Sequence, residues 1–229
     1  MGKTTLAQEI VVDEDRVFIL DLMGGYEKDR HGKPLADVVW GRDASIEAML
    51  EASQTRRFKL ALRCIEQYEM LDVLEMAWEV ENTLVVIEET SFLCSPTYLP
   101  PQLARLVRYG RHREISQLYI ARRPSEIHRD LTAQSDAIVT FQQKETRDLA
   151  YLQASGFDPA RVVGLPPYRC EAVGDPIPFA ALKHLWQTRL TLAPAVGQQI
   201  PLTEGEESVI QPAEEGDAEA LGADSEPSP

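Results

Sequence analysis

The 229-residue sequence is poor in basic residues and cysteine, and it has no long apolar segment. Its 23 Lys and Arg are outnumbered by 37 Asp and Glu, and this excess argues against a protein that coats nucleic acid with a basic surface. No run of 18 apolar residues occurs, so no membrane-spanning helix is expected. The first residues lack the apolar core of a secretory signal. A cytoplasmic protein is therefore predicted.

The spacing of the three cysteines gives no sign of a reactive or metal-binding site. Cys64, Cys94 and Cys170 are widely separated, and no two of them form a C-x-x-C motif. Such spacing favours neither a disulfide framework nor a zinc site. We expect these side chains to be small core residues.

The acidic residues are unevenly distributed and divide the chain into two parts. Nine of them lie in residues 203–229, which contain no Lys or Arg, so residues 1–202 keep 28 acidic and 23 basic residues. The acidic segment has no aromatic residue and is expected to be disordered, because it cannot bury enough apolar surface. The sequence predicts one folded domain over 1–202 and an acidic tail over 203–229.

The folded part shows apolar segments that alternate with helical patterns. This order predicts an α/β fold with a mostly parallel sheet covered by helices on both faces. Residues 24–34 are polar, and two interpretations stay open: a plain surface loop, or a loop that contacts DNA phosphates. Strands are expected at 16–21, 57–64, 84–87, 117–121, 137–141 and 169–173, and helices at 45–53, 67–80, 101–113, 125–134 (with Ser125 as N-cap), 144–155 and 179–190.

The residues Gly2, Lys3, Thr4 and Thr5 match the second half of a Walker A phosphate-binding loop. Glycine lets backbone N–H groups approach phosphates, and the helix expected to continue through 6–10 would direct its N-terminus at them. Lys3 would reach the β- and γ-phosphates of ATP, and the Thr4 hydroxyl would bind Mg²⁺. The first half of the loop and the strand before it do not occur in the sequence, so the first strand of the fold is expected to be missing.

A second motif lies about 80 residues further along the chain. Residues 84–87, Leu-Val-Val-Ile, predict a buried strand that delivers Glu88 and Glu89 at its carboxyl end. This pattern resembles a Walker B motif, in which Glu88 would hold Mg²⁺ through water and Glu89 would act as general base on the attacking water. Aspartate is more usual at the first of these positions.

A third segment, 103–124, combines a helix, the sequence Gly-Arg-His-Arg-Glu at 110–114, an apolar strand and Arg122-Arg123-Pro124. Together with the two motifs above, it resembles the FtsK–HerA superfamily of ring-forming DNA-pumping ATPases, which have a RecA-like (ASCE) P-loop NTPase fold. The resemblance implies that Arg111 reaches the γ-phosphate of a neighbouring subunit, with Arg108 and Arg113 as alternatives. It also implies that Arg122 takes the position of a γ-phosphate sensor, which is usually glutamine.

The resemblance implies a motor that hydrolyses ATP with Mg²⁺ and translocates double-stranded DNA, as in genome packaging, and that assembles into a ring, a hexamer in this family. Two alternatives remain open. The chain could be a degenerate P-loop domain that only binds a partner, or a phage assembly ATPase that does not act on DNA. If a phage encodes the chain, the expected location is the host cytoplasm.

Overall fold

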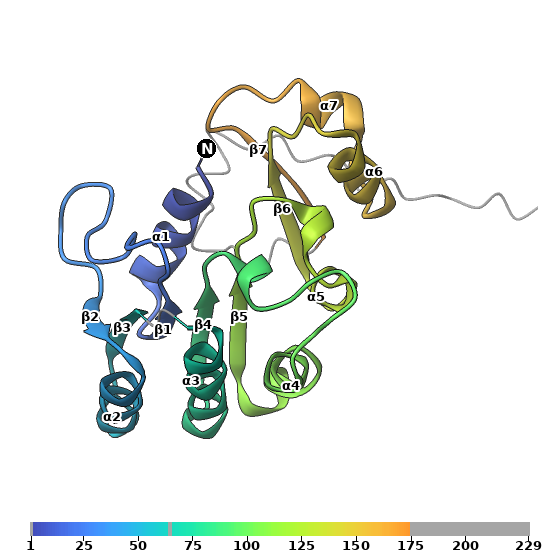
Figure 1. Ribbon diagram of the computed structural model, residues 1–229. Helices are drawn as coiled ribbons and strands as arrows, with labels where there is room; N and C mark the ends of the chain where they lie inside the picture. Colours follow the sequence, from blue (N-terminus) through green and yellow to red (C-terminus); the bar gives the residue numbers. More distant parts are fainter. Residues whose placement is uncertain (1, 64–65, 175–229) are drawn as a thin grey trace, which may run out of the picture. The chain divides into compact units, whose positions relative to one another are not determined.

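The computed structural model describes residues 2–63 and 66–174 (Figure 1). No helix within these ranges is long and apolar enough to span a membrane. The predicted helix at 179–190, the boundary at 202, the acidic tail and Cys64 lie outside them. The helices are α1 (Lys3–Asp13), α2 (Arg42–Ser53), α3 (Gln67–Val80), α4 (Pro101–Tyr109), α5 (Arg129–Ala133), α6 (Thr146–Ala154) and α7 (Pro159–Val163), with 3-10 turns η1 (Thr90–Phe92), η2 (Gly110–Arg113) and η3 (Pro124–Glu126). The strands are β1 (Arg16–Leu20), β2 (Asp37–Trp40), β3 (Phe58–Arg63), β4 (Thr83–Ile87), β5 (Ile115–Tyr119), β6 (Ala137–Phe141) and β7 (Cys170–Gly174).

Five of the strands form one parallel sheet in the order β2-β3-β1-β4-β5. Every residue of β4 is buried, as expected for an apolar and largely β-branched strand with neighbours on both edges and helices on both faces. The predicted class, α/β with a mostly parallel sheet, is confirmed.

Side chains of the central strands alternate between two hydrophobic clusters, one on each face of the sheet. On one face, Val17 and Ile19 of β1 pack with Ala7 and Val11 of α1. On the other, β1 contributes Phe18 and Leu20 to a larger cluster, to which α2, α3 and α4 supply Met49, Met70, Leu74, Leu103 and Leu106. Figure 1 shows α2, α3 and α4 side by side on this second face. The helices therefore cover both faces.

Strands β6 and β7 form a separate, two-stranded antiparallel sheet. Helix α6 packs against it through Leu152, together with Phe157 and with Val162 of α7. Both strands were expected from their apolar pattern. The pattern does not indicate strand direction, so this antiparallel pair was not anticipated.

Two predicted helices are shorter than expected because polar side chains end or interrupt them. Helix α4 ends at Tyr109, where the Gln117 side chain donates a 2.8 Å hydrogen bond to the Leu106 carbonyl. The helix expected over 125–134 is the turn η3 followed by α5. Ser125 donates its hydroxyl to Asp148 over 2.6 Å, and His128 is the residue that caps α5. The prediction that Ser125 caps this helix was wrong.

The remaining differences concern position and short elements. The strand expected at 117–121 is β5, which begins and ends two residues earlier. Strand β2 and helix α7, of four and five residues, were not predicted. Elements this short carry too few apolar residues to show a period. Cys94 and Cys170 are buried, as expected of small core residues.

Candidate functional site

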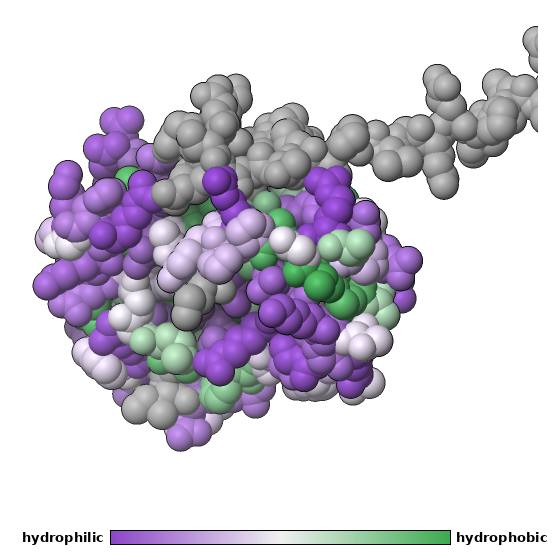
Figure 2. Space-filling view, turned by 90° about the horizontal axis from the view of Figure 1, so that it is seen from above, coloured by the Kyte–Doolittle hydropathy of each residue, from purple (hydrophilic) through white to green (hydrophobic). Residues whose placement is uncertain are grey.

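Three neighbouring strands of the parallel sheet, β1, β4 and β5, end at the same level. The Glu88 amide donates to the Leu20 carbonyl over 3.2 Å, and the Ile120 amide donates to the Ile87 carbonyl over 3.0 Å. The polar residues after β1, β4 and β5 therefore meet at the carboxyl ends of the strands, where ligands of parallel α/β folds bind. Figure 2 views the molecule from the side on which α1 begins, and mostly hydrophilic side chains surround a smaller hydrophobic patch there.

Helix α1 begins at this edge. Gly2 precedes it with φ of 116° and leaves the helix without a side-chain cap. A Cβ at Gly2 would lie 2.6 Å from the Phe141 ring, so both the backbone conformation and the space require glycine. The N–H groups of the first turn have no partner inside the helix. Lys3 and Thr5 are half-buried in this turn, and among the described residues Lys3 has no ion-pair partner.

Thr4 and Glu88, the two predicted metal ligands, lie close together. The Tyr26 hydroxyl donates a hydrogen bond to the Glu88 carboxylate over 3.1 Å, and the Thr4 side chain lies beside the same carboxylate. Burial raises the pKa of Glu88, and the neighbouring Thr4 and Tyr26 hydroxyls oppose the shift. Burial and the neighbouring Glu88 charge also raise the pKa of Tyr26, which keeps its phenol protonated and available as a donor. A threonine hydroxyl beside a carboxylate suits Mg²⁺, which prefers oxygen ligands.

Tyr26 was not recognised as a site residue in the sequence, because residues 24–34 read as a polar loop. It is fully buried, since the loop after β1 folds back over α1. The Asp21 carboxylate accepts hydrogen bonds from the amides of Gly24 and Gly25, over 2.8 and 2.9 Å, and this turn directs the chain toward Thr4. An aromatic residue directly after two glycines was the only available signal.

The loop is also held to α1 by polar contacts. The Gln8 side chain donates to the Gly25 carbonyl over 2.6 Å, and Arg30 pairs with Glu9. Lys28 and Lys33 are exposed and make no ion pair within the described ranges. The structure shows a surface loop that packs on α1 and leaves these two lysines exposed. Contact of this loop with DNA phosphates stays a prediction.

Glu89 follows β4 and faces Arg122, which follows β5. The Arg122 Nε donates to the Glu89 carboxylate over 2.8 Å, and this hydrogen bond raises the pKa of Arg122. Glu89 has a φ of 51°, a left-handed conformation that is uncommon for a residue other than glycine. Such strain is often retained at functional sites. The structure therefore brings Glu89 and Arg122 together beside the Thr4–Glu88 pair.

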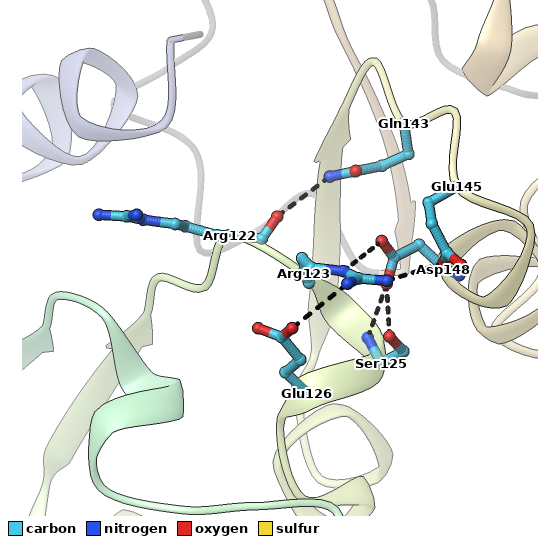
Figure 3. Close-up of polar contacts among 7 residues, drawn as sticks. All are labelled: Arg122, Arg123, Ser125, Glu126, Gln143, Glu145 and Asp148. Carbon is cyan, nitrogen blue, oxygen red and sulfur yellow. Dashed lines mark hydrogen bonds and ion pairs between the residues drawn. The ribbon is translucent and has the colours of Figure 1, made fainter.

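Arg122 and Arg123 are adjacent in sequence and have different surroundings. Figure 3 shows the Arg122 side chain directed away from a polar cluster that holds Arg123. In this cluster Arg123 pairs with the buried carboxylate of Asp148 over 3.0 Å, and also contacts Glu126 and Glu145. Arg123 therefore connects η3 to α6. The side chain of Arg122 instead contacts Glu89 at the carboxyl end of β4.

Arg111 lies at the opposite ends of the strands, where β5 begins. It belongs to η2, which leads into the amino end of β5, while the residues described above follow the carboxyl ends of the strands. Arg111 is exposed, and it makes no ion pair with any residue in the described ranges. The predicted alternatives are both engaged: Arg108 with Asp130 over 2.8 Å, and Arg113 with Glu81. Arg111 cannot reach this site within its own chain, so any contact with a bound nucleotide requires a second subunit.

The substitution Glu88→Gln is expected to stabilise the protein at neutral pH in the absence of nucleotide and Mg²⁺. Because burial raises the pKa of Glu88, the folded state binds its proton more tightly than the unfolded state does. This contribution to stability is complete below the ordinary glutamate pKa and is lost as pH rises through the raised value. Each unit of pKa elevation corresponds to about 1.4 kcal/mol.

Thermal unfolding followed from pH 4 to pH 8 measures this effect. The melting temperature of Glu88→Gln should exceed that of the unchanged protein at pH 8, and the difference should shrink toward pH 4. Glu47→Gln, at an exposed position on α2, is the control and should show no such trend. A lower melting temperature for Glu88→Gln at pH 8 would contradict the assignment.

The sequence matches no protein family and no curated protein. Among solved structures, it is similar to the genome packaging NTPase B204 of Sulfolobus turreted icosahedral virus 2 in complex with AMPPCP. The two sequences are 12% identical, the match covers 61% of this chain and 77% of that chain, and the TM-score is 0.47. The same protein in complex with ATP-gammaS has 12% identity, coverage of 61% and 91%, and a TM-score of 0.47. The DNA-packaging ATPase B204 of Sulfolobus turreted icosahedral virus has 15% identity, coverage of 70% and 92%, and a TM-score of 0.47. Values in this range do not by themselves assign a function.

Proposed function

We propose that this chain is an ATP-hydrolysing motor that assembles into a ring and translocates double-stranded DNA. One observation carries the proposal. The uncapped start of α1, the neighbouring Thr4 and Glu88 side chains, and the Glu89 carboxylate all lie at the carboxyl ends of the parallel strands. The resemblance of the three sequence motifs to DNA-pumping ATPases supports the choice of DNA as the substrate that is moved, and of a ring, a hexamer in that superfamily, as the assembly.

Each residue has a role that follows from its position. The backbone N–H groups of the first turn of α1 and the Lys3 ammonium would bind the phosphates of ATP, and Gly2 allows the close approach. Thr4 and Glu88 would hold Mg²⁺, which neutralises phosphate charge when it is bound. Tyr26 orients the Glu88 carboxylate by hydrogen bonding.

Glu89 and Arg122 would act on the reaction itself. Glu89 would accept the proton of the attacking water, as a carboxylate within hydrogen-bond reach of that water can. Arg122 holds Glu89 in the structure and has an exposed side chain that can turn toward a γ-phosphate. We propose that Arg122 exchanges between these two anions, so that Glu89 is released when a phosphate is present.

DNA contact is assigned to the loop after β1. Lys28 and Lys33 are its exposed cations without an ion pair in the described part of the chain, and phosphate contacts from lysine are independent of DNA sequence. Arg30 is already paired with Glu9 and is not expected to take part.

The proposal is tested by measuring ATP hydrolysis with and without double-stranded DNA. We expect Mg²⁺-dependent hydrolysis that DNA stimulates. Lys3→Ala should abolish it and weaken nucleotide binding, because the ammonium would neutralise phosphate charge directly. Lys144→Ala, at an exposed position, is the matched control and should retain activity.

Two outcomes would favour the alternatives. Nucleotide binding without hydrolysis would indicate a non-catalytic binding domain. Hydrolysis that is unaffected by double-stranded DNA would indicate an assembly ATPase that does not act on DNA.

A further inference from the structure

The Trp78 side chain, near the end of α3, contacts two arginine side chains from the segment that contains Arg111. The guanidinium carbon of Arg105, on α4, is 4.5 Å from the centroid of the Trp78 ring, and that of Arg113, on η2, is 4.8 Å from it. A cation over an aromatic face is attracted by the ring when the two are within about 6 Å. Trp78 therefore connects α3 to η2 and to α4, which lies beside α3 in Figure 1.

Each of these two arginines also pairs with a carboxylate from the same part of the chain as Trp78. Arg105 pairs with Glu75 of α3, and Arg113 pairs with Glu81, which directly follows α3. Both carboxylates are about half-exposed, and such ion pairs hold a side chain weakly. The Nε atoms of both arginines are buried, and neither has a hydrogen-bond partner among the described residues. The ring of Trp78 is therefore the buried contact that holds the two guanidinium groups.

Contacts with distant residues also hold the backbone of η2 at both ends. The Asn82 amide, in the loop after α3, donates to the Arg113 carbonyl over 3.0 Å. At the other end, the Gln117 side chain donates to the Leu106 carbonyl over 2.8 Å, and Gly110 packs against this side chain with no room for a Cβ. A 3-10 turn of four residues has few hydrogen bonds of its own, so such contacts decide its conformation.

Arg111 lies between these two held ends. Arg111 and His112 are exposed, whereas Gly110 is buried and Arg113 is half-buried. Arg111 makes no ion pair with any residue in 2–63 and 66–174, so its direction depends on the backbone of η2. That backbone depends in turn on Arg113, and hence on Trp78.

We propose that Trp78 is a positioning residue, whose ring holds Arg105 and Arg113 and thereby sets where η2 presents Arg111. The inference rests on the proposed function, because the motor is what gives Arg111 a role at the nucleotide of a neighbouring subunit. Helix α3 leads into the amino end of β4, so Trp78 lies away from the candidate site of its own chain. Loss of its ring should act through Arg111 and leave nucleotide binding unchanged.

Backbone hydrogen exchange, measured without nucleotide, tests whether Trp78 fixes η2. Trp78→Leu keeps an apolar side chain against the core and removes the aromatic face. The amides of residues 111–114 should exchange at least about tenfold faster in this variant, because the turn opens more often. The amides of β4 should change little. Trp78→Phe keeps an aromatic face and should stay close to the unchanged protein.

Two further variants separate the stacking of arginine on tryptophan from a general loss of packing. Trp40→Leu is the matched control, because the Arg63 guanidinium carbon lies 4.8 Å from the centroid of the Trp40 ring on β2, at the far side of the sheet from β5. It should leave exchange at 111–114 unchanged. Arg113→Met removes one cation, keeps a long apolar side chain and should act as Trp78→Leu does, so it replaces that variant if it does not fold. Unchanged exchange in the folded variants would overturn the proposal.

Hydrolysis by mixed assemblies tests whether the effect passes through Arg111. Trp78→Leu alone should lower kcat by about ten- to a hundredfold with little change in KM, as expected when a distant change misplaces a group that acts in catalysis. Mixed with Glu89→Gln, it should regain activity, because an intact η2 then faces an intact Glu89 at some interfaces. Mixed with Arg111→Ala, it should not, because every subunit then presents a defective η2.

The outcomes are separable from those of the proposed function. Faster exchange at 111–114 together with no ATPase activity in the unchanged protein would support the hold of Trp78 on η2 and contradict the motor. Unchanged hydrolysis by Trp78→Leu, or recovery when it is mixed with Arg111→Ala, would overturn a role in positioning Arg111. No recovery with Glu89→Gln would show damage within the subunit itself and would also overturn that role.

Discussion

Glu89→Gln is expected to lower the rate of ATP hydrolysis by about 10²–10⁴-fold while nucleotide binding is retained, because glutamine keeps the size of the side chain and cannot accept the proton of the attacking water. In the structure Glu89 is placed for this role by a left-handed backbone at the end of β4 and by its hydrogen bond to Arg122. The variant should remain folded. The ion pair that it removes involves an arginine that is 63% exposed, and such pairs contribute little to stability.

Single-turnover hydrolysis and equilibrium nucleotide binding, measured on the same preparation, check this expectation. Glu47→Gln is the matched control, because it removes an exposed carboxylate on α2, away from the candidate site. The control should hydrolyse ATP at nearly the original rate. If Glu89→Gln kept more than about a third of the activity, the general base would have to be another residue.

Arg111→Ala is expected to reduce hydrolysis by about 10³-fold or more if Arg111 stabilises the transition state of a neighbouring subunit. The structure favours this arginine over its neighbours, because Arg108 and Arg113 are engaged in ion pairs and Arg111 is exposed. Its position at the amino end of β5 excludes a contact with the site of its own chain.

Mixing two inactive variants distinguishes a contribution between subunits from a local effect. A ring that contains Arg111→Ala and Glu89→Gln subunits includes interfaces at which an intact Arg111 faces an intact Glu89, so part of the activity should return. Arg108→Ala, which loses an exposed pair with Asp130, should retain activity alone. A fully active Arg111→Ala, or no recovery on mixing, would argue against a contribution from the neighbouring subunit.

The sequence was most informative where residues of one kind follow one another. The run Leu-Val-Val-Ile before two glutamates predicted a buried strand with carboxylates at its end, because a strand with neighbours on both sides excludes water from both faces. The Gly-Lys-Thr-Thr motif likewise predicted a helix that follows it and continues through residues 6–10, and α1 spans Lys3–Asp13.

The sequence does not show which of several hydrogen-bond partners a polar side chain will take. Ser125 matched the pattern of a helix cap, and its hydroxyl is taken by Asp148, a residue 23 positions away. His128 caps the helix in its place. A local pattern cannot indicate which distant acceptor a serine will meet, because that depends on how η3 and α6 pack.

The sequence by itself determined the α/β class and the buried strand β4, because these follow from local composition and periodicity. The residues proposed to bind phosphate and metal come from the match of two short segments to the Walker motifs. Only the tertiary structure decided that Thr4 and Tyr26 lie beside Glu88, that Arg122 holds Glu89, and that Arg111 lies at the amino end of β5. The strand order sets these distances. That order depends on pairing between segments far apart in the chain, which neighbouring residues do not encode.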